Sequence, residues 1–217
     1  MQFRLQQHTG QVARDADHDW QPQTRAIFVP KQWEGAFEQW KKNDTTERGA
    51  GEAFMMTGFY MSNNPMAAIM TGAMSASTFG LGTAAALFQN GALIGALAHE
   101  LRPVNRIPHL FIWVSPHGVT EISGLLVASG AGFVMAYALI NPGRRRRGEA
   151  LRVAGKDAIV LLATGTCMMF IAAPIEGFFS FNPRVPDGAK IAFAIMSAIA
   201  WSLFWTQIGK APEPVPD

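Results

Sequence analysis

The sequence predicts an all-α, polytopic integral membrane protein: a helical bundle of about four spanning helices plus short broken or re-entrant helical elements. Hydrophobic residues make up 49% of the 217 positions and charged residues only 16%, whereas about 25% of the residues of a soluble domain are charged. The charges are also segregated, because the stretch from Phe54 to Ile140 contains only four of them, Glu100, Arg102, Arg106 and Glu121.

The predicted bundle divides the chain into three regions. A polar N-terminal segment covers residues 1–53, a transmembrane domain covers residues 54–210, and a polar tail covers residues 211–217. Within the first region, residues 30–42 place apolar or aromatic side chains three and four positions apart, which predicts a short amphipathic helix. Such a helix either lies on the membrane surface with its aromatic rings at headgroup depth or packs on the protein's own loops, and both alternatives stay open.

The first span is predicted over residues 66–88, an uncharged run that is long enough to cross about 30 Å of hydrocarbon. The preceding Asn63-Asn64-Pro65 is expected to start the helix, because asparagine can cap a helix and proline suits its first turn. Small residues four positions apart predict close helix packing in a membrane. Two such sets are Gly72, Ala76 and Gly80, and then Gly91 and Gly95.

Two breaks are expected after this span. The polar tripeptide at residues 89–91 interrupts the apolar run, so residues 92–101 either continue one long tilted helix or form a half-helix that returns to the same side. Residues 107–114 form a second short element. Pro116 and Gly118 are expected to break the backbone at His117, since non-helical backbone at membrane depth occurs where it is buried in protein or lines a cavity.

Three further spans are predicted over residues 118–140, 158–181 and 189–208. Pro174 is expected to kink the second of these, and Trp201 and Trp205 are expected to anchor the third at the membrane interface.

The four arginines of the loop between the first two of these spans, Arg144, Arg145, Arg146 and Arg147, predict a cytoplasmic loop that faces anionic lipids or a partner. The C-terminus is then also cytoplasmic. If residues 66–117 cross the membrane once in net, the N-terminal segment lies on the same side.

Ionisable residues inside the predicted spans point to a functional site. His117 and Glu121 share a helix face if the turn is helical, and Glu176 follows Pro174. Asn64, Asn90 and Thr120 are expected to complete this polar cluster. Three interpretations remain open: a hydrogen-bonded network that ties helices together, a proton or ion path, and a metal site of one histidine and two glutamates.

Three motifs follow one another along the chain: Asn63-Asn64, Pro116-His117-Gly118 with Glu121, and Ala172-Ala173-Pro174-Ile175-Glu176-Gly177-Phe178. Over residues 54–182 the chain resembles the stage II sporulation protein M family of polytopic membrane proteins. The resemblance implies a fold and a membrane complex rather than a reaction. Members generally carry a hydrophobic segment upstream, so this chain resembles a shortened member whose missing helix a partner could supply.

The expected function is a non-enzymatic subunit or scaffold of a larger envelope complex in the bacterial inner membrane. The alternatives are a small homo-oligomeric channel or transporter with its path at His117, Glu121 and Glu176, and an enzyme acting on lipid-linked precursors. The sequence predicts no catalytic residues, cofactor or metal, because no serine with a positioned base is apparent and a zinc-protease pair of histidines is missing. The expected partners are other membrane subunits, a second copy of the chain, and anionic lipids. Nucleic acid is excluded, since no basic face alternates with aromatics.

Overall fold

The computed structural model describes residues 22–42, 49–74 and 78–207, and this part of the chain is helical with no strand. The all-α prediction is therefore confirmed. Three short N-terminal helices come first: α2 (Pro22–Phe28), the 3₁₀ helix η1 (Lys31–Trp33) and α3 (Glu34–Lys42). They precede α4 (Ala50–Ala73), α5 (Leu81–Leu101), α6 (Ile107–Ile140), α7 (Arg147–Pro174), the π-helix η2 (Ile175–Ser180) and α8 (Asp187–Gln207).

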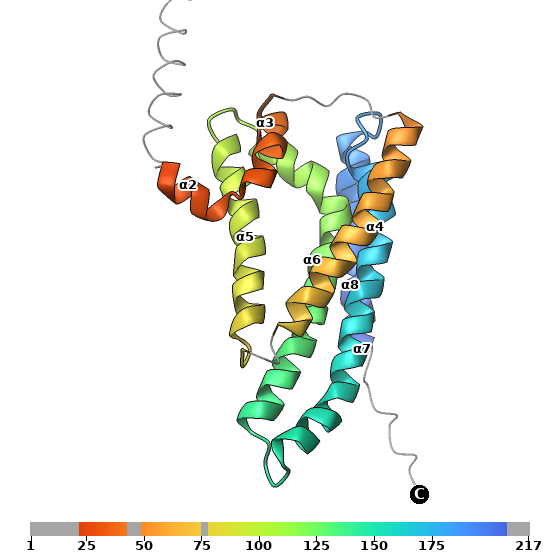
Figure 1. The fold of residues 1–217 in the computed structure, drawn as a ribbon. Coiled ribbons are helices and arrows are strands. Elements are labelled where there is room, and N and C mark those ends of the chain that lie inside the picture. The colour runs from red at the N-terminus through yellow and green to blue at the C-terminus, as the bar shows by residue number, and fades with distance from the viewer. Residues whose placement is uncertain (1–21, 43–48, 75–77, 208–217) are drawn as a thin grey trace, which may run out of the picture.

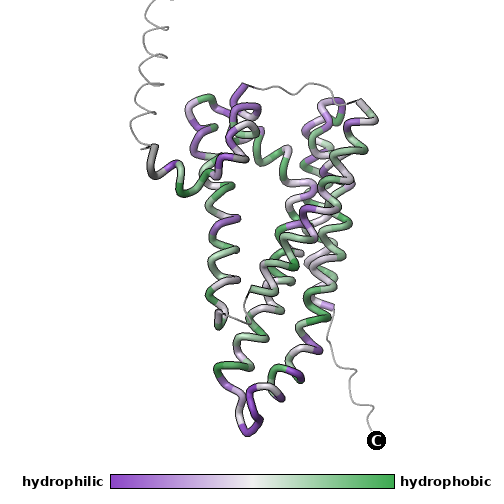
Figure 2. The backbone as a smooth tube through the Cα atoms, viewed as in Figure 1, coloured by the Kyte–Doolittle hydropathy of each residue, from purple (hydrophilic) through white to green (hydrophobic). Residues whose placement is uncertain are grey.

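Four helices of the described part are long and apolar enough to cross a membrane, namely α5, α6, the continuous α7–η2 segment and α8. The helices α4, α6, α7 and α8 form the bundle, while α5 stands to one side of it (Figure 1). Hydrophobic residues dominate the long helices, and the polar residues gather at the two ends (Figure 2). This distribution is the one expected of a polytopic membrane protein.

The backbones of α6 and α7 meet where glycines face one another. A β-carbon built on Gly124 would lie 2.9 Å from the carbonyl oxygen of Gly165, and one built on Gly165 would lie 2.7 Å from the amide nitrogen of Ala128. Both distances are shorter than a van der Waals contact, so only glycine fits at either position. The same approach occurs at Gly72 of α4, whose β-carbon would lie 2.7 Å from the carbonyl oxygen of Ala128.

The other small residues proposed for helix packing are placed differently. Gly80 has a φ of +92° and caps the start of α5, and it also lies against α6, since an added β-carbon would be 3.5 Å from Ala136 Cβ. Gly91 and Gly95 have no atom within 4 Å of an added β-carbon, so they pack against none of the described residues. Ala76 lies outside the described residues, as does the tail at 211–217.

The predicted span over residues 66–88 is wrong, because α4 ends at Ala73 and α5 begins at Leu81. The chain turns at Phe79 and Gly80, both in the left-handed region of φ. The expected helix start at Asn63-Asn64-Pro65 is also wrong, since these residues lie inside α4.

The expected break at His117 is wrong as well, because α6 runs through it without interruption. At residues 89–91 the helix α5 is also continuous, so residues 92–101 continue a helix and do not form a separate half-helix. Pro116 has no N–H to donate to the carbonyl of Ile112, which lies one turn earlier. The hydroxyl of Ser115 donates to that carbonyl instead, at 3.3 Å. Hydroxyl side chains of this kind let transmembrane helices tolerate proline.

The amphipathic segment packs on the protein itself rather than lying free on a membrane. Phe37 of α3 is buried with Val29 and Ala96, a residue of α5. Glu100, near the end of α5, accepts from Arg25 at 2.6 Å and pairs with Lys41 at 2.8 Å. These contacts fasten α2 and α3 to one end of the bundle.

The end that carries α2 and α3 lies opposite the loop at residues 141–146 (Figure 1). The condition under which the N-terminal segment would share a side with the arginine loop, one net crossing by residues 66–117, is therefore not met. The reason is that α4 and α5 run in opposite directions, so residues 50–101 return to the end where they began.

Candidate functional site

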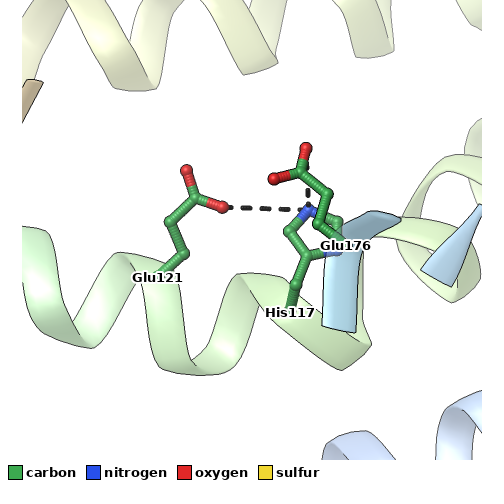
Figure 3. Close-up of side chains that lie close together, drawn as sticks. All are labelled: His117, Glu121 and Glu176. Atoms are coloured by element: carbon green, nitrogen blue, oxygen red, sulfur yellow. Dashed lines mark ion pairs between the residues drawn. The ribbon is translucent and has the colours of Figure 1, made fainter. Parts of the chain in front are cut away.

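Three ionisable side chains converge between α6 and η2. His117 and Glu121 lie one turn apart on α6, and Glu176 faces them from η2 (Figure 3). The Nε2 atom of His117 lies 3.9 Å from Glu121 Oε2 and 3.9 Å from Glu176 Oε1. One ligand atom from each residue lies within 4.8 Å of the other two. The structure thus brings together the three residues that the sequence analysis placed at the centre of the site.

The π-helix after Pro174 places Glu176. Proline has no N–H for the carbonyl one turn back, and from Ile175 to Ser180 the chain adopts the wider π-helical turn. Both Glu176 and Ser180 reach His117 from this turn. The proline therefore produces a π-helix at the position where the sequence predicts a kink, and π-helical turns of this kind often occur at functional sites.

Polar neighbours orient two members of the cluster. The hydroxyl of Ser180 lies 2.8 Å from His117 Nδ1, and Asn64 donates from Nδ2 to Glu176 Oε2 at 3.1 Å. The close approach of α4 to η2 depends on Gly177, where an added β-carbon would lie 3.0 Å from Thr57 Cβ. Three elements therefore build the site, and Asn64 belongs to it as predicted.

Sequence analysis missed Ser180. Its spacing of four residues from Glu176 was the available signal, since such residues share a helix face. The statement that no serine has a positioned base is therefore wrong, because Ser180 lies within hydrogen-bond distance of His117. Ser180 is fully buried, so in this conformation its hydroxyl orients the imidazole and is not open to a substrate.

Exposure differs across the cluster. His117 and Glu176 are buried, whereas 31% of the Glu121 side chain is exposed. The site is therefore closed on the side of η2 and open at Glu121. One imidazole and two carboxylates thus face a common point from α6 and η2. The arrangement can hold a proton or a cation.

The model of the stage II sporulation protein M family matches residues 24–181, which is most of the chain. The chain belongs to the stage II sporulation protein M family. The match starts within α2 and ends just after η2, so it includes the docked N-terminal helices as well as the polar cluster. Together with the four apolar helices it identifies a membrane protein of this family. No curated protein and no solved structure matches the chain.

Two polar residues expected in the site of this family member lie elsewhere. Asn90 is exposed on α5 and donates to the carbonyl of Ala86 in its own helix. Thr120 is buried on another face of α6, where it accepts from Trp201 Nε1 at 2.9 Å. Trp201 therefore ties α8 to α6 through its indole N–H.

A buried lysine of α8 lies against the first half of α6. Lys190 of α8 is fully buried, and its ammonium group lies 3.5 Å from the centroid of the Trp113 ring. This is a cation–π contact, which gains strength away from water. Among the described residues the ammonium group has no hydrogen-bond partner.

The basic loop lies at the opposite end of α6. The arginines at positions 144–147 are all exposed, and Arg147 donates to the carbonyl of Leu139. Arg145 also lines a groove between the end of α6 and the start of α7, together with Tyr137 and Val153. The guanidinium groups are therefore accessible to lipid headgroups or to a partner.

Proposed function

We propose that this chain is a non-enzymatic subunit of a larger protein assembly in the bacterial inner membrane, and that a partner subunit covers α5. The observation that carries the proposal is the middle of α5, where polar and small residues are exposed at membrane depth. Gln89 and Asn90 are exposed at the centre of this spanning helix, and Gly91 and Gly95 have open space beside them.

Contact with lipid does not suit this surface. Among the described residues Gln89 has no hydrogen-bond partner, and in hydrocarbon an amide without a partner is costly. Small residues and amide side chains are the usual contents of helix–helix interfaces in membranes. A neighbouring helix would therefore both satisfy the amides and fill the space at the two glycines.

Comparison with α8 supports this assignment. Both helices are equally exposed, since only 11% of the most apolar 18-residue stretch of each is buried. The exposed residues at the centre of α8 are hydrophobic and suit lipid tails, for example Ile195, Met196 and Ile199. Only α5 carries amides in that position, which favours a protein partner for α5 and lipid for α8.

The proposed orientation places the loop with the four arginines in the cytoplasm, where positive loops are retained. The helix α8 runs toward this end of the bundle (Figure 1), so the proposal also places the C-terminal side of α8 in the cytoplasm. Each exposed arginine would add about 1 kcal/mol of attraction to an anionic leaflet. The docked helices α2 and α3 would then face the outer side.

The test is to extract the protein from its native membrane in mild detergent and identify stoichiometric partners by mass spectrometry. The variant Gly91→Leu adds a bulky group to the proposed interface, while Ala198→Leu adds the same group to an exposed position of α8. We expect the wild type and Ala198→Leu to retain a partner and Gly91→Leu to lose it. Retention by Gly91→Leu, a clean monomer or homo-oligomer in the wild type, or turnover of a lipid-linked substrate would contradict the proposal.

A second candidate function is a small channel or transporter, and the partial exposure of Glu121 beside His117 and Glu176 favours it. A carboxylate at this depth could carry a proton or ion between the two sides of the membrane. The test is dissipation of a pH gradient in liposomes that contain the purified protein. Flux that Glu121→Gln abolishes and Glu149→Gln retains would support a path, and equal rates in protein-free liposomes would exclude it.

A further inference from the structure

We propose that His117, Glu121 and Glu176 bind one divalent first-row transition-metal ion, with Zn²⁺ and Mn²⁺ as the representative ions. The ligands would be His117 Nε2 and one carboxylate oxygen from each glutamate. The ion would join α6 to η2 inside the membrane. None of these residues lies on α5, so the inference is independent of the partner proposed for that helix.

The distances within the cluster fit a shared ion better than direct bonds. The imidazole nitrogen lies 3.9 Å from an oxygen of each carboxylate, which is beyond a hydrogen bond. A tetrahedral ion with bonds of about 2.0–2.2 Å holds its ligands roughly 3.4 Å apart. Each carboxylate would therefore move about half an ångström toward the imidazole, and the two carboxylate oxygens would close from within 4.8 Å of each other. Glutamate side chains can provide both movements by rotating about their single bonds.

The surrounding hydrogen bonds aim the ligand atoms. Ser180 occupies His117 Nδ1, so Nε2 is the ring nitrogen that faces the carboxylates. Asn64 occupies Oε2 of Glu176, so Oε1 is the oxygen that faces the imidazole. Metal-binding histidines and carboxylates usually have such outer partners, which fix the orientation of the ligand.

Charge and ligand type indicate the class of ion. Two carboxylates beside one imidazole nitrogen form an acidic ligand set that suits a divalent cation. A mixed set of one imidazole and two carboxylates suits Zn²⁺, Mn²⁺ or Fe²⁺, whereas Ca²⁺ and Mg²⁺ prefer oxygen ligands alone. The partly exposed Glu121 supplies an entrance for the ion and leaves room for water as a further ligand.

The experiment uses the full chain, purified in detergent, stripped with EDTA and then equilibrated with Zn²⁺ or Mn²⁺. Bound metal per chain is measured by mass spectrometry, and affinity is measured by titration. We expect one ion per wild-type chain and a higher melting temperature with metal. Affinity should fall at least about tenfold in Glu121→Gln and Glu176→Gln, and by about tenfold in Asn64→Ala, which removes an outer partner.

The control is Glu149→Gln, which removes an exposed carboxylate from the first turn of α7, away from the cluster, and should bind metal as the wild type does. If Glu176→Gln does not fold, Glu121→Gln still decides the question, because its side chain is partly exposed. Metal well below one ion per chain in the wild type, or equal affinity in Glu121→Gln and Glu149→Gln, would overturn the proposal.

Discussion

At the scale of single residues, the closest helix contacts depend on glycines, which have no side chain. Gly124 and Gly165 let α6 and α7 touch through their backbones, and Gly177 does the same for η2 and α4. Close backbone approach of this kind maximises van der Waals contact, which drives helix association where lipid removes the hydrophobic effect. The polar cluster depends on these contacts because its members come from three of the four elements that they join, namely α4, α6 and η2.

The glycine at position 165 offers a direct test with a matched control on the same helix. Gly165→Ala would place a β-carbon 2.7 Å from the amide nitrogen of Ala128, and overpacking of this kind costs about 1–3 kcal/mol. Gly155→Ala meets no atom within 4 Å, so it should be neutral or slightly stabilising, as alanine is in helices. Thermal unfolding in detergent measures both, and equal melting temperatures would show that the helices do not approach this closely.

Ser115 is the second residue with a defined structural role, since it donates to the carbonyl that Pro116 cannot satisfy. Ser115→Ala should lower the unfolding free energy by about 0.5–1 kcal/mol. In a Pro116→Ala background the same change should have almost no effect, because the backbone N–H of alanine restores the helical bond. A double-mutant cycle measures this coupling, and additive effects would mean that the serine does not compensate for the proline.

At the scale of elements, Glu100 fastens the N-terminal helices to α5 by accepting from Arg25 and pairing with Lys41. Glu100→Gln should weaken this docking by about 1.5–3 kcal/mol, the contribution of hydrogen bonds to a charged group. Hydrogen exchange over residues 31–42 should then accelerate by roughly tenfold or more. The control Glu34→Gln removes a longer, half-exposed pair with Arg25 and should change exchange little.

The same docking should be insensitive to pH over a wide range. The hydrogen bond from Lys41 lowers the pKa of Glu38 below its usual 4.5, and this pair, which lies within α3 itself, stabilises the docked helix above pH 4.5 and is lost as the pH falls further. Burial lowers the pKa of Lys41, but hydrogen bonds to Glu100 and Glu38 outweigh it and leave the pKa above 10.5. The lysine therefore contributes below pH 10.5 and is lost as the pH rises through its folded value.

Protection of α3 from hydrogen exchange, corrected for the intrinsic rate at each pH, checks this expectation. It should be constant between pH 5 and pH 9 and fall only outside the window from 4.5 to 10.5. A steady loss of protection within that window would show that other groups hold the helix.

The elements also show what sequence could and could not predict. Composition and hydropathy predict the helical membrane fold, and the predicted span that ends at residue 140 ends where α6 does. Asn90 and Pro116 predict breaks that the helices do not have. A proline is tolerated inside a helix when a neighbouring hydroxyl donates the hydrogen bond that the proline cannot. The turn at Phe79 could not be predicted, because an uncharged run has the same hydropathy whether it forms one helix or two.

Within the site, sequence predicts His117, Glu121, Glu176 and Asn64, because ionisable and amide residues inside apolar runs stand out. It did not predict Ser180 or Lys190, and it placed Asn90 and Thr120 in the wrong surroundings. The reason is that spacing fixes the face of one helix, whereas the partners across helices depend on packing and on the π-helical turn at Ile175–Ser180.

At the scale of the whole molecule, the antiparallel run of α4 and α5 sets the topology. It places α2 and α3 at one end of the bundle and the arginine loop, with the end of α8, at the other (Figure 1). Single cysteines at exposed positions can test this arrangement once Cys167, which is itself exposed, is replaced by alanine. Glu38→Cys marks α3, Arg145→Cys marks the loop, and Thr206→Cys marks α8.

With a membrane-impermeant thiol reagent, Arg145→Cys and Thr206→Cys should react only from the cytoplasmic side of sealed vesicles, and Glu38→Cys only from the outer side. The physical reason is that an odd number of crossings, α6 alone, separates the docked end of α5 from the arginine loop. Labelling of Glu38→Cys and Arg145→Cys from the same side would mean that α4 and α5 together add a net crossing. In that case α2 and α3 could not dock on Glu100 while α5 spans the membrane.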